Sequence, residues 1–209
     1  MTRRLERDGR LLLASHNRGK LTEIRALIEP YGLEVVAAAE LGLPEPQETG
    51  STFLDNARIK AVAGAMGGGL PSLADDSGLE VEALGGAPGV HSARWAGPGR
   101  DFRLAMARLA RELGERAAWK KEGPRASFTA VLCLAWPDGE WVAFAGKVAG
   151  HLISPPRGEK GFGYDPMFVA DGHALTFGEM EEDAKHAISH RARAFEQFAR
   201  ACLPGRPPP

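Results

Sequence analysis

The sequence is poor in cysteine, with two such residues in a chain of 209. Cys133 and Cys202 lie far apart, and neither has a second cysteine at the short spacing that zinc sites use. The sequence therefore excludes a disulfide framework and a cysteine-rich metal site. Because Cys133 lies in an apolar stretch and Cys202 on an apolar helical face, we expect both to be packed free thiols.

Long hydrophobic runs are also absent. No apolar stretch approaches the roughly 20 residues that a helix needs to cross a bilayer, so we expect no membrane partner. The polar, basic segment before Arg10 lacks the apolar region of a secretory signal. A reducing cytoplasm is therefore the expected location.

Neither sign of charge is in excess, since the formal net charge is −1. A broad surface for nucleic acid or anionic membrane needs many surplus Lys and Arg residues, so we expect no nucleic-acid partner. A small phosphorylated ligand is still compatible with this balance, because it needs only a local basic pocket. The hydrophobic fraction of 44% is ordinary for a globular protein.

The apolar pattern predicts strands that alternate with helices, which favours an α/β fold. Strands are expected over 10–15, 33–37, 70–75, 127–136 and 141–148, with a hairpin turn over 137–140. Helices are expected over about 21–31, from a cap at Ser51 or Thr52 to Met66, over 100–113, and from Ser189 onward. We predict one domain over 10–203, preceded by a polar extension over 1–9 and followed by a disordered tail over 204–209.

The segment Leu73–Leu79 is the strongest candidate for a functional site. An apolar run leads directly into Asp75 and Asp76, then Ser77 and a glycine. A buried carboxylate needs a cation or a proton, which points to a site that binds a metal or transfers a proton. Asp, Ser and Gly are equally typical of a solvated turn. If the strand continues, the two aspartates point to opposite faces, and only one can enter a given site.

Further polar clusters stand beside predicted strand or helix ends. In chain order, together with the aspartate segment, they resemble the inosine/xanthosine triphosphate pyrophosphatase family from about Leu11 to Phe198. The clusters that carry the resemblance are Ser15-His16-Asn17-Arg18-Gly19-Lys20, Glu48-Thr49-Gly50-Ser51-Thr52, Asn56-Ala57 with Lys60-Ala61, Leu84-Gly85-Gly86-Ala87-Pro88-Gly89, Gly161-Phe162-Gly163-Tyr164-Asp165-Pro166, and Lys185 with Ser189-His190-Arg191.

The resemblance implies an elongated mixed α/β fold with a central twisted sheet and two lobes, and a homodimer. It also implies Mg²⁺-dependent hydrolysis of deaminated purine nucleoside triphosphates (dITP, ITP and XTP) to the monophosphate and pyrophosphate, a reaction that cleans the nucleotide pool. Glu48 and Asp76 map onto the metal-binding acids, and Asp76 also onto the general base. Asp75 maps beside them, as a neighbour that shapes the site.

The resemblance assigns the triphosphate to the segment of Ser15, His16, Asn17, Arg18, Gly19 and Lys20. A helix N-terminus with a nearby glycine suits phosphate, although the residues alone equally describe a polar helix start with exposed cations. Lys60 maps onto a further phosphate contact. From the residues alone, a lysine on this helix would be expected to face solvent. Arg94 either reaches phosphate or pairs with an acid.

The nucleobase is assigned by resemblance to Phe162, Gly163, Tyr164 and Asp165. Aromatic rings between glycines can meet a planar base, although a turn with core aromatics gives the same pattern. Further substrate contacts map onto Ser77, Lys185, His190 and Arg191. Without the resemblance, the basic pair His190 and Arg191 would indicate only a surface feature in the first turn of a helix.

Two rival functions fit parts of this pattern. A nucleotide sensor without hydrolysis would keep the base-contacting residues but could dispense with Glu48 and Asp76. A sister enzyme would hydrolyse another modified nucleotide, such as a pyrimidine. The presence of both acids argues against the sensor.

Overall fold

The structure is a computed structural model that describes residues 3–205, apart from the side chain of Arg18. Its strands are β1 (Arg10–Leu13), β2 (Glu34–Ala37), β3 (Ser72–Val81), β4 (Arg125–Ala135), β5 (Trp141–Leu152) and β6 (Phe168–Ala170). Its α-helices are α1 (Arg18–Ile28), α2 (Phe53–Gly68), α3 (Phe102–Glu115), α4 (Glu182–Ile188) and α5 (His190–Cys202). Short 3₁₀ segments include η1 (Glu29–Tyr31) and η6 (Asp165–Met167).

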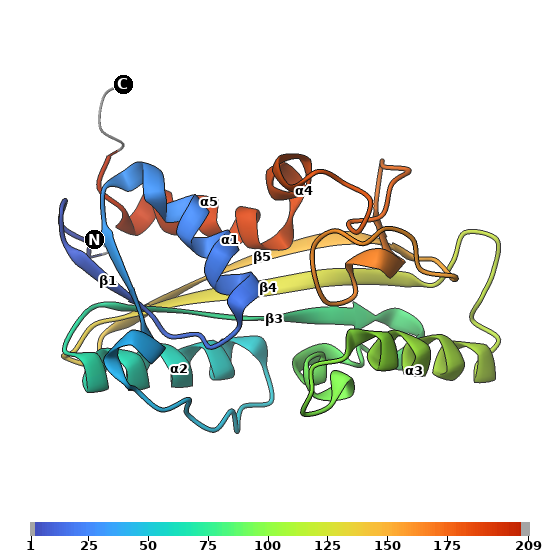
Figure 1. Ribbon diagram of the computed structural model, residues 1–209, viewed down its shortest axis with the longest axis horizontal. Coiled ribbons are helices and arrows are strands. Elements are labelled where there is room, and N and C mark those ends of the chain that lie inside the picture. Colours follow the sequence, from blue (N-terminus) through green and yellow to red (C-terminus); the bar gives the residue numbers. More distant parts are fainter. Residues whose placement is uncertain (1–2, 206–209) are drawn as a thin grey trace. The chain divides into compact units, whose positions relative to one another are not determined.

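The six strands form one sheet in the order β2-β1-β3-β4-β5-β6 (Figure 1). β1 pairs in parallel with both β2 and β3, whereas β5 and β6 are antiparallel. The sheet is therefore mixed, which confirms the predicted mixed α/β class. The chain also divides into two compact units, and three of the strands contribute residues to both.

The first unit comprises the described parts of Met1–Asp76, Ala130–Gly146 and Arg191–Pro209. In this unit α1 and α5 cover one face of the sheet and α2 covers the other (Figure 1). Apolar side chains such as Leu73, Ile24 and Phe198 form the core on the first face. On the second face a Cβ at Gly64 would overlap the Ser72 hydroxyl, so glycine allows α2 to lie directly against β3.

The second unit comprises Ser77–Thr129 and Lys147–His190. Its core joins Leu79 and Phe128 from the strands to Leu109 of α3 and Phe168 of β6. The Asp101 side chain accepts a hydrogen bond from the Arg103 backbone at 3.0 Å and caps α3. This unit also contains η6 and α4, which include the polar residues Asp165 and Lys185.

Most predicted elements are present, with shifted ends. The β3 strand is the main difference, because it runs through Asp75-Asp76-Ser77-Gly78 to Val81 instead of ending at Asp75. The interpretation of this segment as a turn is therefore wrong. The helix capped by Thr52 ends at Gly68, and Gly69 follows it in the left-handed conformation with φ 64°. Helix α4, which contains Lys185, was not predicted.

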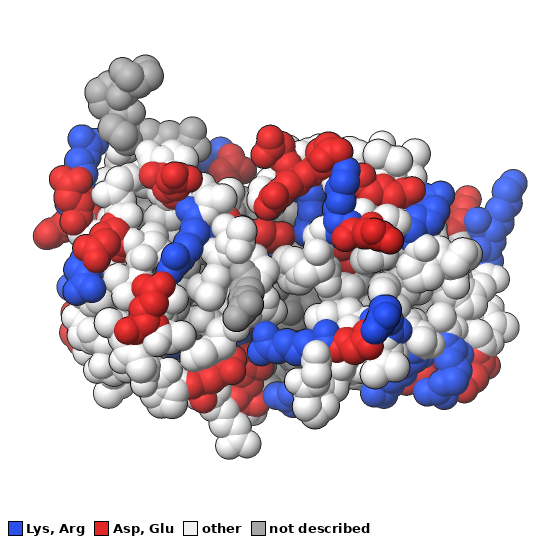
Figure 2. Space-filling view, viewed as in Figure 1, with Lys and Arg blue, Asp and Glu red and all other residues white. Residues whose placement is uncertain are grey.

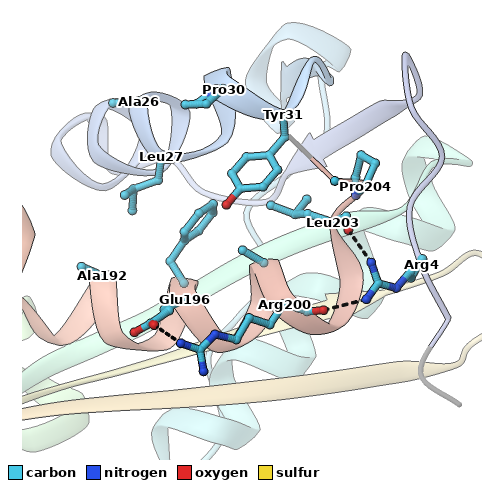
Figure 3. A pocket seen from close by; sticks show the side chains of 13 residues that line it. Arg4, Ala26, Leu27, Pro30, Tyr31, Ala192, Glu196, Arg200, Leu203 and Pro204 are labelled. Carbon is cyan, nitrogen blue, oxygen red and sulfur yellow. Dashed lines mark hydrogen bonds and ion pairs between the residues drawn. The ribbon is translucent and has the colours of Figure 1, made fainter. Parts of the chain in front are cut away.

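The N-terminal extension binds the C-terminal end of α5. The Leu5 side chain is buried in the first unit, and the Leu5 backbone N–H donates to the Cys202 carbonyl at 2.7 Å. Arg4 donates to the carbonyls of Arg200 at 2.8 Å and Leu203 at 3.1 Å (Figure 3). Helix α5 ends at Cys202, and Arg4 caps this end by bonding one carbonyl of the last turn and one just beyond it.

A cavity of about 640 Å³ lies beside this cap, between α1 with η1 and α5 (Figure 3). Leu27 and Tyr31 line one side, and Phe195 lines the other. The predicted tail falls mostly on residues 206–209, which lie outside the described residues, and the predicted domain limits stay predictions.

Both cysteines are buried free thiols, as expected. Burial raises the pKa of Cys202 to about 11 and that of Cys133 to about 12. On the face shown in Figure 2, acidic and basic side chains alternate and form no large patch of one sign. Over residues 3–205, no helix is long and apolar enough to span a bilayer.

Candidate active site

The predicted site residues fall into two groups, one in each unit. The first unit contains the acids Glu48 and Asp76, both lysines predicted to contact phosphate, and Arg191. The second unit contains the residues predicted to contact the base, together with Ser77, which is partly exposed. In the first group the members are Ser15, His16, Asn17, Arg18, Gly19, Lys20, Glu48, Lys60, Asp76 and Arg191, and in the second Ser77, Phe162, Gly163, Tyr164, Asp165, Lys185 and His190.

The β1–α1 turn (residues 15–20) begins with two side-chain caps. The Asn17 backbone N–H donates to Ser15 Oγ at 3.2 Å, and the Lys20 backbone N–H donates to Asn17 Oδ1 at 3.3 Å. Asn17 is the N-cap of α1, which places Gly19 in the first helical turn. The N-terminal end of α1 is thus built as a site that can accept an anion. His16 lies beside it, with Nδ1 4.0 Å from Glu45 Oε1.

Lys60 joins the two predicted metal ligands. Its ammonium donates to Glu48 Oε1 at 2.6 Å and to Asp76 Oδ1 at 3.0 Å, and its side chain is 7% exposed. The solvent-facing reading of Lys60 is therefore wrong. Burial alone would lower the pKa of Lys60, but the charges of Asp76 and Glu48 outweigh it and raise that pKa. Helix α2 therefore delivers a permanent positive charge between two acids from separate segments.

Asp76 is the buried acid of this cluster. Burial raises its pKa, and the nearby Lys60 charge offsets that effect only in part. Oδ1 accepts from Lys60, whereas the buried Oδ2 has no hydrogen-bond partner among the described residues. An acceptor oxygen in this position is able to bind a cation or to take a proton from water.

The donor set fits Mg²⁺. This ion commonly uses one or two carboxylates and completes its shell with water and substrate phosphates. Glu48, whose side chain is 27% exposed, and Asp76 with its available Oδ2 can provide those carboxylates. Across residues 3–205, no three His, Cys, Asp or Glu side chains gather as an all-protein metal cage. The chain would therefore need substrate and water to complete the coordination.

Asp75 points to the opposite face of β3, toward α1 and α5. Its Oδ1 lies 2.6 Å from Lys20 Nζ, and its Oδ2 accepts from Arg191 Nε at 3.1 Å. Arg191 also pairs with Glu23 of α1. Burial alone would raise the pKa of Asp75, but Arg191 and Lys20 hold it well below its usual range. Arg191 is only 2% exposed, so the surface interpretation of this arginine is wrong.

The second unit contains a buried pair between η6 and α4. Lys185 Nζ donates to Asp165 Oδ2 at 2.7 Å, and the same oxygen accepts from the Phe162 backbone at 2.8 Å. The Lys185 ammonium also lies 5.0 Å from the centroid of the Phe162 ring. A Cβ at Gly161 would overlap the Asp165 carboxylate, so glycine is needed there. Lys185 therefore contacts both the Asp165 carboxylate and the partly exposed ring of Phe162.

Two other predicted base contacts are buried in this unit. The Tyr164 hydroxyl donates to the Ser92 carbonyl at 3.0 Å. The His190 imidazole stacks on Phe128 with ring centroids 5.0 Å apart. Gly163 has φ 72° and provides the turn between Phe162 and Tyr164. Arg94, for which two roles were open, lies exposed with a guanidinium nitrogen 3.1 Å from His91 Nδ1.

Sequence reasoning missed Glu23. Its side chain is 7% exposed and pairs with Arg191, which lies 168 positions along the chain. A signal was present, because Glu23 follows Lys20 by three positions and shares its face of α1. Nothing in the sequence indicated which distant cation this acid would meet.

Comparisons with known proteins show the family of this chain. The model of the Ham1 family matches residues 11–201. A dITP/XTP pyrophosphatase from Zymomonas mobilis is 59% identical, with 96% of this chain and 95% of that protein covered. A dITP/XTP pyrophosphatase from Bradyrhizobium diazoefficiens is 54% identical over 95% and 97% of the two chains. The solved structure of a HAM1 protein from Coxiella burnetii has a TM-score of 0.83 and 37% identity, over 91% of this chain and 96% of that one.

Proposed function

Because the chain belongs to the Ham1 family, we propose that it is a Mg²⁺-dependent pyrophosphatase acting on the deaminated purine nucleotides dITP, ITP and XTP. The relatives named dITP/XTP pyrophosphatase support the substrate class, at 59% and 54% identity. The products are the nucleoside monophosphate and pyrophosphate. The observation that carries the proposal is the buried Asp76 carboxylate, with one oxygen on Lys60 and the other available for chemistry.

In this reaction Asp76 takes a proton from the attacking water. The water oxygen forms a bond to the α-phosphorus, and the bond from that phosphorus to the bridging oxygen breaks, so pyrophosphate leaves. Asp76 Oδ2, which has no hydrogen-bond partner among the described residues, is the oxygen that accepts this proton. Mg²⁺ held by Glu48 and Asp76 would neutralise phosphate charge and orient the triphosphate.

The lysines supply the remaining positive charge. Lys20 and the backbone N–H groups of the β1–α1 turn bind the triphosphate. Lys60 keeps Asp76 and Glu48 in place and contributes its own charge toward the phosphates. Charge that develops on the phosphates thus meets groups that are already oriented before substrate arrives.

The residues of the second unit recognise the nucleobase. Phe162 stacks on it, and hydrogen-bond donors such as Lys185 and His190 select a keto oxygen at position 6. Adenine presents an amino donor there, so several contacts would fail together and discriminate by roughly 10⁴-fold. GTP shares that oxygen, and its exclusion depends on the 2-amino group. We expect little preference between ribose and deoxyribose.

The test is pyrophosphate release from ITP, dITP, XTP, ATP, GTP and pyrimidine triphosphates, with and without Mg²⁺. We expect kcat/KM for ITP and XTP far above that for ATP, and no turnover after Mg²⁺ removal. Equal hydrolysis of ITP and ATP would contradict the proposal. Tight binding without hydrolysis would favour the nucleotide sensor, and preference for a pyrimidine triphosphate would favour the sister enzyme.

The same proposal includes a homodimer in the cytoplasm. Light scattering after size exclusion would check the homodimer, for which a mass of twice 22.3 kDa is expected.

A further inference from the structure

The buried carboxylate of Asp75 takes no part in the chemistry proposed above. Its side chain has no exposed surface, and each of its two oxygens meets a cation. Oδ1 lies 2.6 Å from the ammonium of Lys20 on α1, and Oδ2 lies 3.1 Å from Nε of Arg191 on α5. Asp75 is therefore the contact through which β3 binds cations from two helices.

The cluster joins four charged side chains. Glu23 pairs with Arg191, so the four residues carry two positive and two negative charges, and none of their side chains is more than 13% exposed. A buried charge is costly without its partner, so the position of each member depends on the others. The contacts form a chain in which Glu23 holds Arg191, Arg191 holds Asp75, and Asp75 holds Lys20.

We propose that Asp75 is a positioning residue that aims the Lys20 ammonium at the triphosphate. The inference rests on the proposed function, which assigns triphosphate binding to Lys20. An ammonium has three N–H donors, so one can remain on Asp75 while others donate to phosphate oxygens. Because Asp75 and Asp76 are neighbours on a continuous strand, they face opposite ways, and Asp75 acts separately from the proton acceptor.

A double-mutant cycle tests whether Asp75 acts through Lys20. Asp75→Asn, Lys20→Met and the double variant are compared with the intact chain by calorimetric binding of inorganic tripolyphosphate and by KM and kcat for ITP. We expect Asp75→Asn to weaken tripolyphosphate binding and raise KM by about tenfold, with a smaller effect on kcat. In the Lys20→Met background the same substitution should cause little further loss, because the ammonium that it positions is gone.

If Asp75 had only a structural role, the double-mutant cycle would give a different pattern of affinity losses. If the two losses add within about twofold, or if folded Asp75→Asn binds tripolyphosphate as the intact chain does, the inference is wrong. Should Asp75→Asn alone fail to fold, the double variant removes one charge of each sign and therefore leaves the net charge of the cluster unchanged. Its affinity must then equal that of Lys20→Met. Asp75→Glu, which retains the carboxylate, should recover part of the affinity.

The outcomes separate this inference from the proposed function. An intact chain that binds tripolyphosphate through Lys20 but releases no pyrophosphate from ITP would contradict the proposed function and leave the role of Asp75 standing. An intact chain that hydrolyses ITP with no effect of Asp75→Asn would contradict the role of Asp75 alone.

Discussion

Lys185 Nζ lies 2.7 Å from Asp165 Oδ2, and each of the two side chains is only 5% exposed. The pair joins α4 to η6 within the second unit, at the loop that carries Phe162. Because the carboxylate also accepts the Phe162 backbone N–H, the ion pair fixes the loop as well as the two charges. Under the proposed function, this arrangement makes both stability and base recognition depend on Lys185.

Lys185→Met should therefore destabilise the protein by about 3–5 kcal/mol, because it leaves the Asp165 charge buried without its cation. Urea unfolding would measure the loss. Lys147→Met is the matched control, since Lys147 forms an exposed pair with Glu80, and its loss should cost less than about 1 kcal/mol. Equal losses of unfolding free energy in the two variants would show that the buried pair stabilises the fold no more than the exposed pair does. Lys185→Met with Asp165→Asn should recover stability.

Asp76→Asn should keep the fold and lower kcat for ITP by about 10²–10⁴-fold, because the amide cannot accept the proton. Steady-state pyrophosphate release at saturating Mg²⁺ measures the effect. Asp171→Asn is the control, since Asp171 is an exposed aspartate paired with Arg125 and should leave kcat unchanged. Near-normal turnover of Asp76→Asn would exclude this residue as the general base.

The lowered pKa of Asp75 predicts a dependence of stability on pH. In the unfolded chain the carboxyl titrates near 3.8, and in the folded chain it titrates lower, so the folded state binds fewer protons. The stabilisation is complete above that value and is lost as pH falls below it toward the folded-state pKa. Urea unfolding of the intact chain and Asp75→Asn at several pH values should show a stability difference that shrinks below about pH 4. A difference that grows on acidification would reverse this assignment.

Arg4→Ala should loosen the end of α5. It removes two hydrogen bonds to carbonyls at a partly exposed helix terminus, which should cost about 1 kcal/mol and lower Tm by about 2–4 °C. Arg111→Ala serves as control, because that arginine forms an exposed ion pair with Glu115 on the surface of α3. If both variants melt alike, the N-terminal extension does not stabilise α5 through Arg4.

Five of the six strands, all except the three-residue β6, could be predicted from the sequence because their apolar periodicity is local. The end of β3 was not predictable in this way, since Asp, Ser and Gly favour turns by local preference. Within the first unit, Asp75 and Asp76 meet cations on opposite faces, and those pairings keep the segment extended. Tertiary contacts thus overrode the turn preference of these residues.

In the candidate site, too, local features could be predicted from the sequence and long-range pairings could not. The caps of α1 and α2 lie within three positions of the groups they bind, so a sequence pattern can reveal them. Arg191 and Asp75 are separated by 116 positions, and Glu23 and Arg191 by 168. Their pairing depends on how α1 and α5 cover one face of the sheet, which no local pattern contains.

The alternation of side chains along β3 makes the length of this segment as important as its composition. One inserted residue ahead of Asp75 would rotate the following side chains by half a turn, so that Asp75 would replace Asp76 opposite Lys60. Asp76 would move to the position that Ser77 now occupies, two residues beyond the place of Asp75. A single inserted residue would therefore keep both acids in the sequence and still remove the carboxylate that meets Lys20 and Arg191.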